Sequence, residues 1–325
     1  MEVKNTTGNL HCHSTEELGS LFLPIVMSVE MIIGLPGNAI AMWIFCFRMK
    51  SWKAHTLFLT NLVLADFLLI VSVPFRIDTH LRNEDWVFGA VLCRINLFML
   101  TVNRSASIAF MTAVALNRYF KVVHPHHCVS HMTRTQAALF SGLIWTIVTA
   151  FSIPLLTADL LQKHGNISLC RSFSSYETVP LVMMIHYMAF IAEFFLPWLL
   201  LLFCSGRIIF SLRQRRLERQ KTVRRAIVTV GVISLVFTIC FMPGVITGLG
   251  AMCIKKFHPS DCDTYRRFTQ GFKMCIAFTY LNSTLDPVIY CFSSSMFRET
   301  LKNSIRHLCS YKKEFSQVSS STTSS

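Results

Sequence analysis

Charged residues, and acidic residues above all, are scarce in this chain of 325 residues. Only 15% of the residues are charged, whereas soluble domains carry about 25%. Asp and Glu number 17 against 31 Lys and Arg, and 52% of the residues are hydrophobic. The shortage of charge excludes an ordinary soluble domain and predicts that much of the chain lies in a membrane.

The sequence also lacks the patterns on which most enzymes and metal proteins depend. It has no Gly-rich phosphate loop, no His and Cys residues at zinc spacing, and no nucleophile beside a general base. Internal repeats are absent, and Met1–Ser20 has no signal-peptide pattern. These absences predict that the protein is not an enzyme and requires no cofactor.

What the sequence does contain is a series of long apolar runs. The runs are Leu21–Phe47, Leu57–Phe75, Val91–Leu116, Ala137–Ala158, Val179–Cys204, Ala226–Ile254 and Met274–Phe292. Each is about long enough to cross the hydrocarbon core as a helix. We therefore expect an all-α membrane protein, with a seven-transmembrane helix bundle over 21–292 that follows an N-terminal segment over 1–20.

Basic residues gather in the first, third and fifth loops and in the C-terminal tail. The fifth loop alone has eight basic residues against one acidic residue. The positive-inside rule then predicts an extracellular N-terminus and a cytoplasmic C-terminus in a multi-pass plasma membrane protein. The basic surplus is thus a topology signal and not a nucleic-acid-binding surface. Asn5 and Asn166 lie in glycosylation patterns on the outer side.

The segment after the last run has the pattern of an amphipathic eighth helix, over 293–309. Its apolar residues at helical spacing are Phe297, Leu301, Ile305 and Leu308. Such a helix lies on the membrane surface, and Cys309 at its end is a candidate for palmitate. The Ser/Thr-rich residues 310–325 predict a disordered cytoplasmic tail.

Four of the twelve cysteines lie at the outer side: Cys12, Cys93, Cys170 and Cys262. An oxidising compartment favours two disulfides, but spacing alone leaves three pairings open.

Arg104 lies within the apolar stretch "FMLTVNRSASIAF", about 16 Å along the helix from Cys93. The preceding Asn103 begins a glycosylation pattern, as does Asn282, but both fall inside spans that the glycosylating enzymes do not reach. A buried guanidinium takes a carboxylate with two hydrogen bonds. We expect Arg104 to form the floor of an outward-open pocket and to lack a partner until an anion binds.

The alternative is a structural ion pair within the protein. Arg104 would then pair with Glu30, Glu193 or Asp66, the acidic residues inside other spans.

Several motifs follow one another on the predicted spans. They are Gly37-Asn38, "NLVLADF" around Asp66, "ALNRYFKVVHP", "CFMP" and "NSTLDPVIY". Together they resemble the rhodopsin-like G-protein-coupled receptors over about residues 20–308. The resemblance implies a receptor that couples to a heterotrimeric G protein, with an arrestin and a receptor kinase acting on the phosphorylated tail.

The resemblance assigns roles to polar residues inside the spans. The residues implied to hold an allosteric sodium ion are Asp66, Asn103, Ser107, Asn282 and Ser283. Those implied in G-protein activation are Asn117, Arg118, Tyr119, Phe241, Pro243, Asp286, Pro287 and Tyr290. A hydrogen-bonded network with water and no ion is the alternative for the first set.

Two departures from the family pattern concern Arg118. Asn117 replaces the usual Asp, and Val223 stands where an acidic partner is usual. We therefore hypothesise a loosely held inactive state with basal signalling. Phe241 replaces the usual Trp in the sixth span but keeps an aromatic ring.

Other positions bear on the ligand. Leu100 stands where receptors for amines carry Asp, and Tyr280 where opsins carry Lys, so neither an amine nor retinal fits. The segments "LFMLTVNRSAS", "HPHHCVS", "EFFLP" and "AFTYLNSTLDPVIYCFSS" are similar to the hydroxycarboxylic acid and oxoeicosanoid receptors. The predicted ligand site is Arg104, Arg76, Tyr280, Leu97, Leu100, Thr101, Ser172, Phe173, His186 and Phe278.

The narrower resemblance implies that Arg104 holds the carboxylate with help from Tyr280. It also implies the disulfides Cys93–Cys170 and Cys12–Cys262 and coupling to inhibitory Gi/o proteins. Asn117 and the single N-terminal cysteine make the chain look more like the oxoeicosanoid receptor. The favoured ligand is therefore an oxo or hydroxy polyunsaturated fatty acid.

Two alternative functions stay open from the sequence. One is a receptor for short hydroxycarboxylic acids such as lactate or hydroxybutyrate. The other is a monocarboxylate transporter, although the chain shows no two related halves.

Overall fold

The computed structural model describes residues 3–4, 10–11, 22–49, 52–165, 167–170, 181–215, 221–258, 260–304 and 306. The predicted site residues outside these ranges are Asn5, Cys12, Asn166, Ser172, Phe173 and Cys309. The side chain of His186 is also outside the description. Their predicted roles stay predictions.

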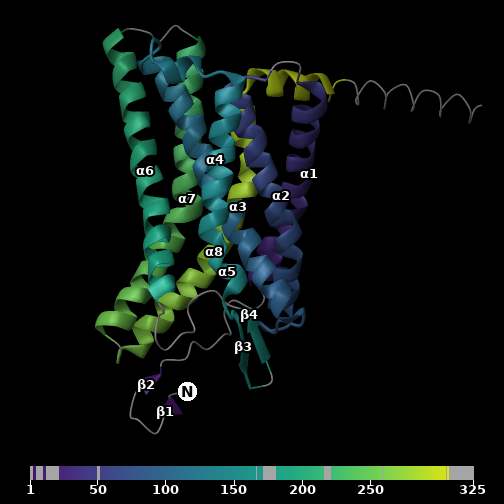
Figure 1. Cartoon of the computed structure of the whole chain (residues 1–325), viewed down its shortest axis with the longest axis vertical. Helices are drawn as coiled ribbons and strands as arrows, with labels where there is room; N and C mark the ends of the chain where they lie inside the picture. The colour runs from purple at the N-terminus through teal and green to yellow at the C-terminus, as the bar shows by residue number, and fades with distance from the viewer. Residues whose placement is uncertain are drawn as a thin grey trace, which may run out of the picture.

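Seven long helices form one bundle (Figure 1). They are α1 (Phe22–Trp43), α2 (Ala54–Leu81), α3 (Gly89–Val123), α4 (Arg134–Ser152), α6 (Leu181–Arg215), α7 (Lys221–Phe257) and α8 (Cys262–Ser293). The shorter elements are η1 (Ile44–Arg48), η2 (Cys128–His131), α5 (Pro154–Thr157), β1 (Val3–Lys4), β2 (Leu10–His11), β3 (Leu161–His164) and β4 (Ile167–Cys170). In the described part of the chain, six helices are long and apolar enough to cross a membrane. The seventh, α8, is more polar but 32 residues long and packs along α7 and α1, so the predicted seven-helix fold is confirmed.

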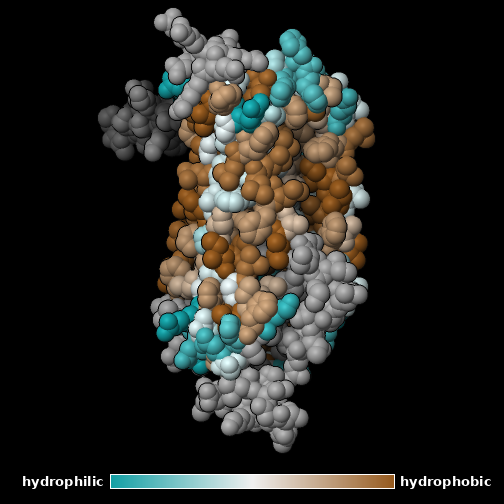
Figure 2. All heavy atoms as spheres, turned by 90° about the vertical axis from the view of Figure 1, so that its left-hand side faces the viewer, coloured by the Kyte–Doolittle hydropathy of each residue, from teal (hydrophilic) through white to brown (hydrophobic). Residues whose placement is uncertain are grey.

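The surface of the bundle explains the shortage of charge. Ile32, Leu139 and Leu196 are each more than 70% exposed, although all three are aliphatic. Figure 2 shows a brown apolar belt between two hydrophilic ends on the side formed by α6 and α7. Apolar side chains face outward in this way when lipid and not water surrounds them. The protein is therefore a multi-pass membrane protein.

The two ends of the bundle differ. We call the end that carries β3 and β4 the hairpin end, and the opposite end, which carries Arg118 and Arg225, the basic end. In Figure 1 the hairpin end is at the bottom.

Close helix contacts at two glycines fix the packing around α8. A Cβ at Gly37 of α1 would lie 2.9 Å from Cγ of Pro287, and a Cβ at Gly250 of α7 would overlap the ring of Phe268. At both positions a side chain of α8 occupies the space that a Cβ would need, so glycine allows the closest packing. The two contacts hold α8 against α1 and, at the hairpin end, against α7.

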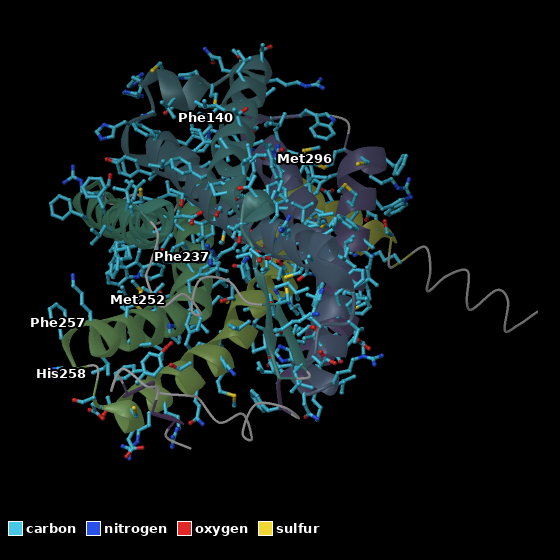
Figure 3. All side chains as sticks on the ribbon, turned by 60° about the horizontal axis from the view of Figure 1, so that its bottom comes forward. Phe140, Phe237, Met252, Phe257, His258 and Met296 are labelled. Carbon is cyan, nitrogen blue, oxygen red and sulfur yellow. A yellow bond between two sulfur atoms is a disulfide. The ribbon has the colours of Figure 1, made fainter. Side chains whose placement is uncertain are left out.

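The bundle interior is aromatic, as Figure 3 shows for Phe237. This side chain is fully buried and stacks on Phe194 with ring centroids 5.4 Å apart. Phe257, in contrast, is the last residue of α7 and is 67% exposed, and His258 follows it directly.

A small antiparallel hairpin, β3–β4, is fixed to the start of α3. Leu161 pairs with Cys170, and Cys170 forms a disulfide with Cys93, as the family resemblance implies. The backbone N–H of Trp86 donates to the Ser168 carbonyl at 2.7 Å. The hairpin is thus held over the mouth of the bundle by one covalent and several hydrogen bonds.

Cys262 is also disulfide-bonded. The other described cysteines are either free or in the Cys93–Cys170 bridge, so its partner lies outside the described residues. The pairing with Cys12 stays a prediction.

A further helix, over 295–304, follows α8 and lies across the basic end (Figure 1). Phe297 is only 2% exposed and packs against Phe45 and Tyr290, with ring centroids 5.3 and 6.0 Å away. Lys302 is exposed. The helix is amphipathic, with its apolar face on the bundle.

Candidate ligand-binding site

The inward face of α3 carries the predicted ligand residues toward the hairpin end. Leu97 is buried in a cluster with Trp86 and Cys93, and Leu100 packs in the cluster that contains Tyr280. Thr101 and Arg104 are half-buried on the same side. Residues three and four apart share a helix face, which explains why these side chains point together.

Arg104 has an acidic neighbour. Its Nη2 lies 3.8 Å from Oε2 of Glu193 on α6, and both side chains keep about a quarter of their surface exposed. The expectation that this guanidinium lacks a partner in the free protein is therefore wrong. The physical reason is that a charge so deep in an apolar bundle is costly without a countercharge, and α6 supplies one.

Tyr280 interacts electrostatically with four charged residues, Arg76, Arg104, Glu30 and Glu84. Its side chain is 9% exposed and packs against Met27, Leu69 and Val73. The structure therefore brings the predicted pair Arg104 and Tyr280 into one neighbourhood and adds Arg76 to it.

Arg76 is rigidly positioned. Its Nε donates to Oδ1 of Asn96 at 2.8 Å and its Nη1 to the Cys170 carbonyl at 3.1 Å. The guanidinium carbon also lies 5.7 Å from the centre of the Trp86 ring. Arg76 thus ties α2 to α3 and to β4, and it places a second positive charge beneath the hairpin.

Asn96 is a residue that sequence reasoning missed. It is 2% exposed, and its Nδ2 donates to the Ser72 carbonyl at 2.8 Å, which fixes the amide that holds Arg76. A buried polar residue in an apolar run was the available signal, the same one that identified Arg104.

The prediction for Phe278 is wrong. This ring is 42% exposed, while Tyr280, two positions along α8, faces the interior. Residues two apart on a helix point in nearly opposite directions, so Phe278 lies on the outer face.

The polar cluster around Asp66 lies deeper in the bundle. Oδ2 of Asp66 accepts from the Tyr290 hydroxyl at 2.9 Å, and Nδ2 of Asn103 donates to the Ala65 carbonyl at 3.0 Å. Within the described part of the chain, five buried oxygens there have no hydrogen-bond partner: Asp66 Oδ1, Ser107 Oγ, Asn282 Oδ1, Ser283 Oγ and Asp286 Oδ1. Such oxygens suit a hard cation.

Arg118 lies at the basic end of α3. Its Nη2 donates to the backbone carbonyl of Ser293, and it forms no ion pair within the described residues. Neighbouring Asn117 is 2% exposed, and neither its Nδ2 nor its Oδ1 has a hydrogen-bond partner there. Val223 is buried as well. The predicted absence of acidic partners therefore holds for the described part of the chain.

The other predicted activation residues follow the interior of α3, α7 and α8. Tyr119 packs against Phe203 of α6, and Phe241 lies 5.1 Å from Phe237, centre to centre. Pro243 and Pro287 lie inside α7 and α8.

Comparison with known proteins identifies the family of this chain. Residues 37–290 match the family described as 7 transmembrane receptor (rhodopsin family). This chain belongs to that family. As a rhodopsin-family receptor it is not an enzyme, its partners include a G protein and a small-molecule ligand, and the transporter alternative is rejected.

Individual relatives narrow the group to which this rhodopsin-family receptor belongs. The chain is 45% identical to human hydroxycarboxylic acid receptor 2 over 278 residues, 85% of this chain and 75% of the relative. It is 44% identical to the rat protein of that name over 88% of this chain and 79% of the relative. Identity to human oxoeicosanoid receptor 1 is 42%, over 88% and 73%. These values correct the predicted subgroup, because the chain is not nearer to the oxoeicosanoid receptor.

Proposed function

We propose that the protein is a cell-surface receptor for a carboxylate, with Arg104 as the anchor of the acid group. The observation that carries the proposal is the interior site in which Arg104, Arg76 and Tyr280 come together beneath the hairpin. Two positive charges and one hydroxyl donor in an apolar bundle favour a small anion.

The ion pair with Glu193 gives the binding step a mechanism. At 3.8 Å the two side chains attract each other without a short hydrogen bond. A ligand carboxylate that takes Arg104 with two hydrogen bonds has better geometry and displaces Glu193. Arg104 is on α3 and Glu193 is on α6. This exchange therefore breaks an ion pair between the two helices and forms hydrogen bonds between Arg104 and the ligand.

For the ligand itself we favour a long-chain oxo or hydroxy fatty acid. Leu97 and Leu100 offer apolar contacts beside the charged site. The second candidate is a short hydroxycarboxylic acid, which the 44–45% identity to hydroxycarboxylic acid receptor 2 favours.

On the signalling side we propose a G protein of the inhibitory Gi/o type. The exposed residues of the basic end, and Arg118 once it leaves the Ser293 carbonyl, would contact the G protein. The Ser/Thr-rich tail would take phosphate from a receptor kinase and bind an arrestin. In this orientation the hairpin end faces outside the cell.

A sodium ion fits the Asp66 cluster. The five oxygens without a partner among the described residues would supply two carboxylate, two hydroxyl and one amide ligand, and a bound ion would tie α2, α3 and α8 together.

The experiment is a panel of carboxylates of increasing chain length, tested for stimulation of GTP exchange on a Gi protein in membranes that contain the receptor. We expect activation by long oxo acids in the wild type and a large loss of potency with Arg104→Ala. Activation only by two- to four-carbon hydroxy acids would select the second candidate. Equal activation of the wild type and Arg104→Ala would reject a carboxylate site at Arg104.

A further inference from the structure

A histidine and a glutamate meet at the hairpin end of α2, and neither belongs to the candidate ligand site. Nδ1 of His80 lies 2.8 Å from Oε1 of Glu84, so the two form an ion pair when the imidazole is protonated. Their side chains are only 12% and 22% exposed, although they lie where α2 ends. The contact is therefore mostly shielded from water.

The chain after α2 adopts an unusual backbone conformation to make this contact. Asn83 and Glu84 have φ angles of 55° and 70°, in the left-handed region that residues other than glycine rarely adopt. The backbone N–H of Glu84 donates to the Thr79 carbonyl at 2.9 Å, which closes the turn. Conformations of this kind persist where surrounding contacts hold them, often at binding sites. Here the turn places the Glu84 carboxylate beside His80.

Glu84 also acts on the candidate ligand site. Arg76 lies one turn before His80 on the same face of α2, and it interacts electrostatically with Glu84. The hydrogen bonds of Arg76 within the described structure go to two neutral acceptors, the Asn96 amide and the Cys170 carbonyl. Glu84 therefore brings negative charge to a site that is proposed to bind a carboxylate, and it competes with that ligand for Arg76.

The charge of His80 decides how strongly Glu84 opposes the ligand. Histidine is the side chain that ordinarily changes its charge between pH 5 and 8. When His80 is neutral, the negative charge of Glu84 attracts Arg76 and repels a second carboxylate. When His80 is protonated, it offsets the charge of Glu84 and leaves the attraction of Arg76 for the ligand.

We propose that His80 is a proton-binding site through which acid at the hairpin end raises the affinity of the receptor for carboxylates. The inference rests on the function proposed above, because it concerns the ligand of that same site. A carboxylic acid dissociates in water into its anion and a proton, so a greater supply of ligand and a lower pH occur together. The receptor would respond most strongly when both are present.

Other ionisable groups near this pair determine which controls are needed. Arginine stays charged and tyrosine stays neutral between about pH 6 and 8. Glu30 of α1 is a second carboxyl group that acts on Tyr280, so it requires its own variant. Asp85 faces the hairpin instead, where its Oδ1 accepts from the Ser168 backbone N–H at 2.9 Å. The groups of the neighbouring helices that interact with Glu84 or Tyr280 are Arg76, Arg104, Glu30 and Tyr280 itself.

The test measures the Kd of 3-hydroxybutyrate and of a twenty-carbon oxo fatty acid for the full-length receptor in lipid nanodiscs, by microscale thermophoresis between about pH 6 and 8. The quantity compared is the ratio of the Kd of a variant to that of the wild type at one pH, because the ionisation of the acid is then the same for both. For His80→Asn this ratio should be about one at pH 8 and about four at pH 6. That is the size expected for one charge about 10 Å from the ligand.

Two further variants change the charge of the pair permanently. His80→Lys is positive at every pH in the series, so it should bind both acids about fourfold more tightly than the wild type at pH 8. Glu84→Gln removes the competing carboxylate and should give a similar gain at pH 8. A gain from both variants distinguishes charge from the loss of a particular side chain.

Three neighbouring groups serve as controls. Asp78 forms an ion pair with Arg82 on α2 at 2.7 Å, but on the exposed face, so Asp78→Asn should leave the Kd unchanged at every pH. His258 is an exposed histidine at the same end of the bundle, and His258→Asn should keep the pH dependence of the wild type. Glu30→Gln should keep it as well.

Several outcomes would overturn the proposal. A ratio of one for His80→Asn at every pH would show that the ligand does not sense this histidine. A pH dependence that Glu30→Gln abolishes and His80→Asn retains would assign it to Glu30. Equal gains from Asp78→Asn and Glu84→Gln would reduce the effect to general surface charge.

Failure of the carboxylate site itself gives a different result. If neither acid binds, or if Arg104→Ala binds them as the wild type does, the function proposed above is rejected and this inference with it. If binding depends on Arg104 but not on the charge of His80, only this inference is rejected.

Discussion

Helix α3 carries two arginines in the interior of the bundle, and the protein holds them in different ways. Arg104, toward the hairpin end, faces the carboxylate of Glu193, whereas Arg118, at the basic end, donates to the backbone carbonyl of Ser293. A carboxylate partner can be exchanged for a ligand carboxylate, so the first arrangement suits recognition of an acid. A carbonyl carries only a partial charge, so the second arrangement suits a side chain that must leave its partner during signalling.

The largest expected effect comes from removing the first arginine. Arg104→Ala should lower the potency of every carboxylate agonist by about 30-fold or more, because a buried charge pair with the ligand is worth about 2–5 kcal/mol. Concentration–response curves for GTP exchange measure the change. Leu64→Ala, at a 48% exposed position on the outer face of α2, is the control and should behave as the wild type. If Arg104→Ala is expressed normally at the surface and agonist potency is unchanged, Arg104 does not bind the ligand carboxylate.

Replacing Glu193 should give Arg104 an uncharged partner, as Arg118 has in the Ser293 carbonyl. Glu193→Gln removes the competitor of the ligand, so carboxylate affinity should rise by about five- to tenfold in a radioligand binding assay. Asp159→Asn is the matched control, since Asp159 lies 3.8 Å from Arg94 in an ion pair at the surface. If both variants raise affinity equally, the effect is general electrostatics and not exchange at Arg104.

The reverse change gives Arg118 an acidic neighbour. Asn117→Asp places a carboxylate on a buried side chain that has no hydrogen-bond partner among the described residues. Ligand-free GTP exchange should fall by about two- to threefold, because an ion pair holds Arg118 more firmly than the Ser293 carbonyl does. Asn117→Ala, which adds no charge, should keep the basal rate. Basal exchange that is the same in all three proteins would contradict the idea of a loosely held Arg118.

The smallest expected effect separates the inner face of the helices from the outer face. Phe278→Ala, at a 42% exposed position, should change agonist potency by less than about twofold. Leu100→Ala, in the Tyr280 cluster, should lower it by about tenfold through lost apolar contact. Equal effects would show that Phe278 reaches the ligand after all.

The number of spans was predictable, but their ends were not. The last apolar run begins at Met274, whereas α8 begins at Cys262, where Asp261 accepts a hydrogen bond from the Thr264 backbone N–H. Hydropathy reports only the part of a helix that lipid surrounds, so a polar extension capped outside the membrane leaves no signal.

The sequence indicated that Arg104 belongs to the site, but it did not indicate which residues the arginines of α3 contact. A buried Arg104 could be recognised from its apolar surroundings, yet the choice of Glu193 over Glu30 or Asp66 depends on how α3 and α6 face each other. The Ser293 carbonyl that binds Arg118 is backbone and leaves no trace in the residue type. Phe278 was misplaced because composition does not give the rotation of α8 about its axis.

The overlap that any side chain at Gly250 would make with Phe268 has a mechanical consequence. Because α7 and α8 are in close contact there, α7 can pivot about a point near the hairpin end. Val223 lies about 40 Å from Gly250 along α7, toward the basic end. A tilt of α7 by a few degrees about the contact of Gly250 with Phe268 would therefore move its end at the basic end by several ångströms.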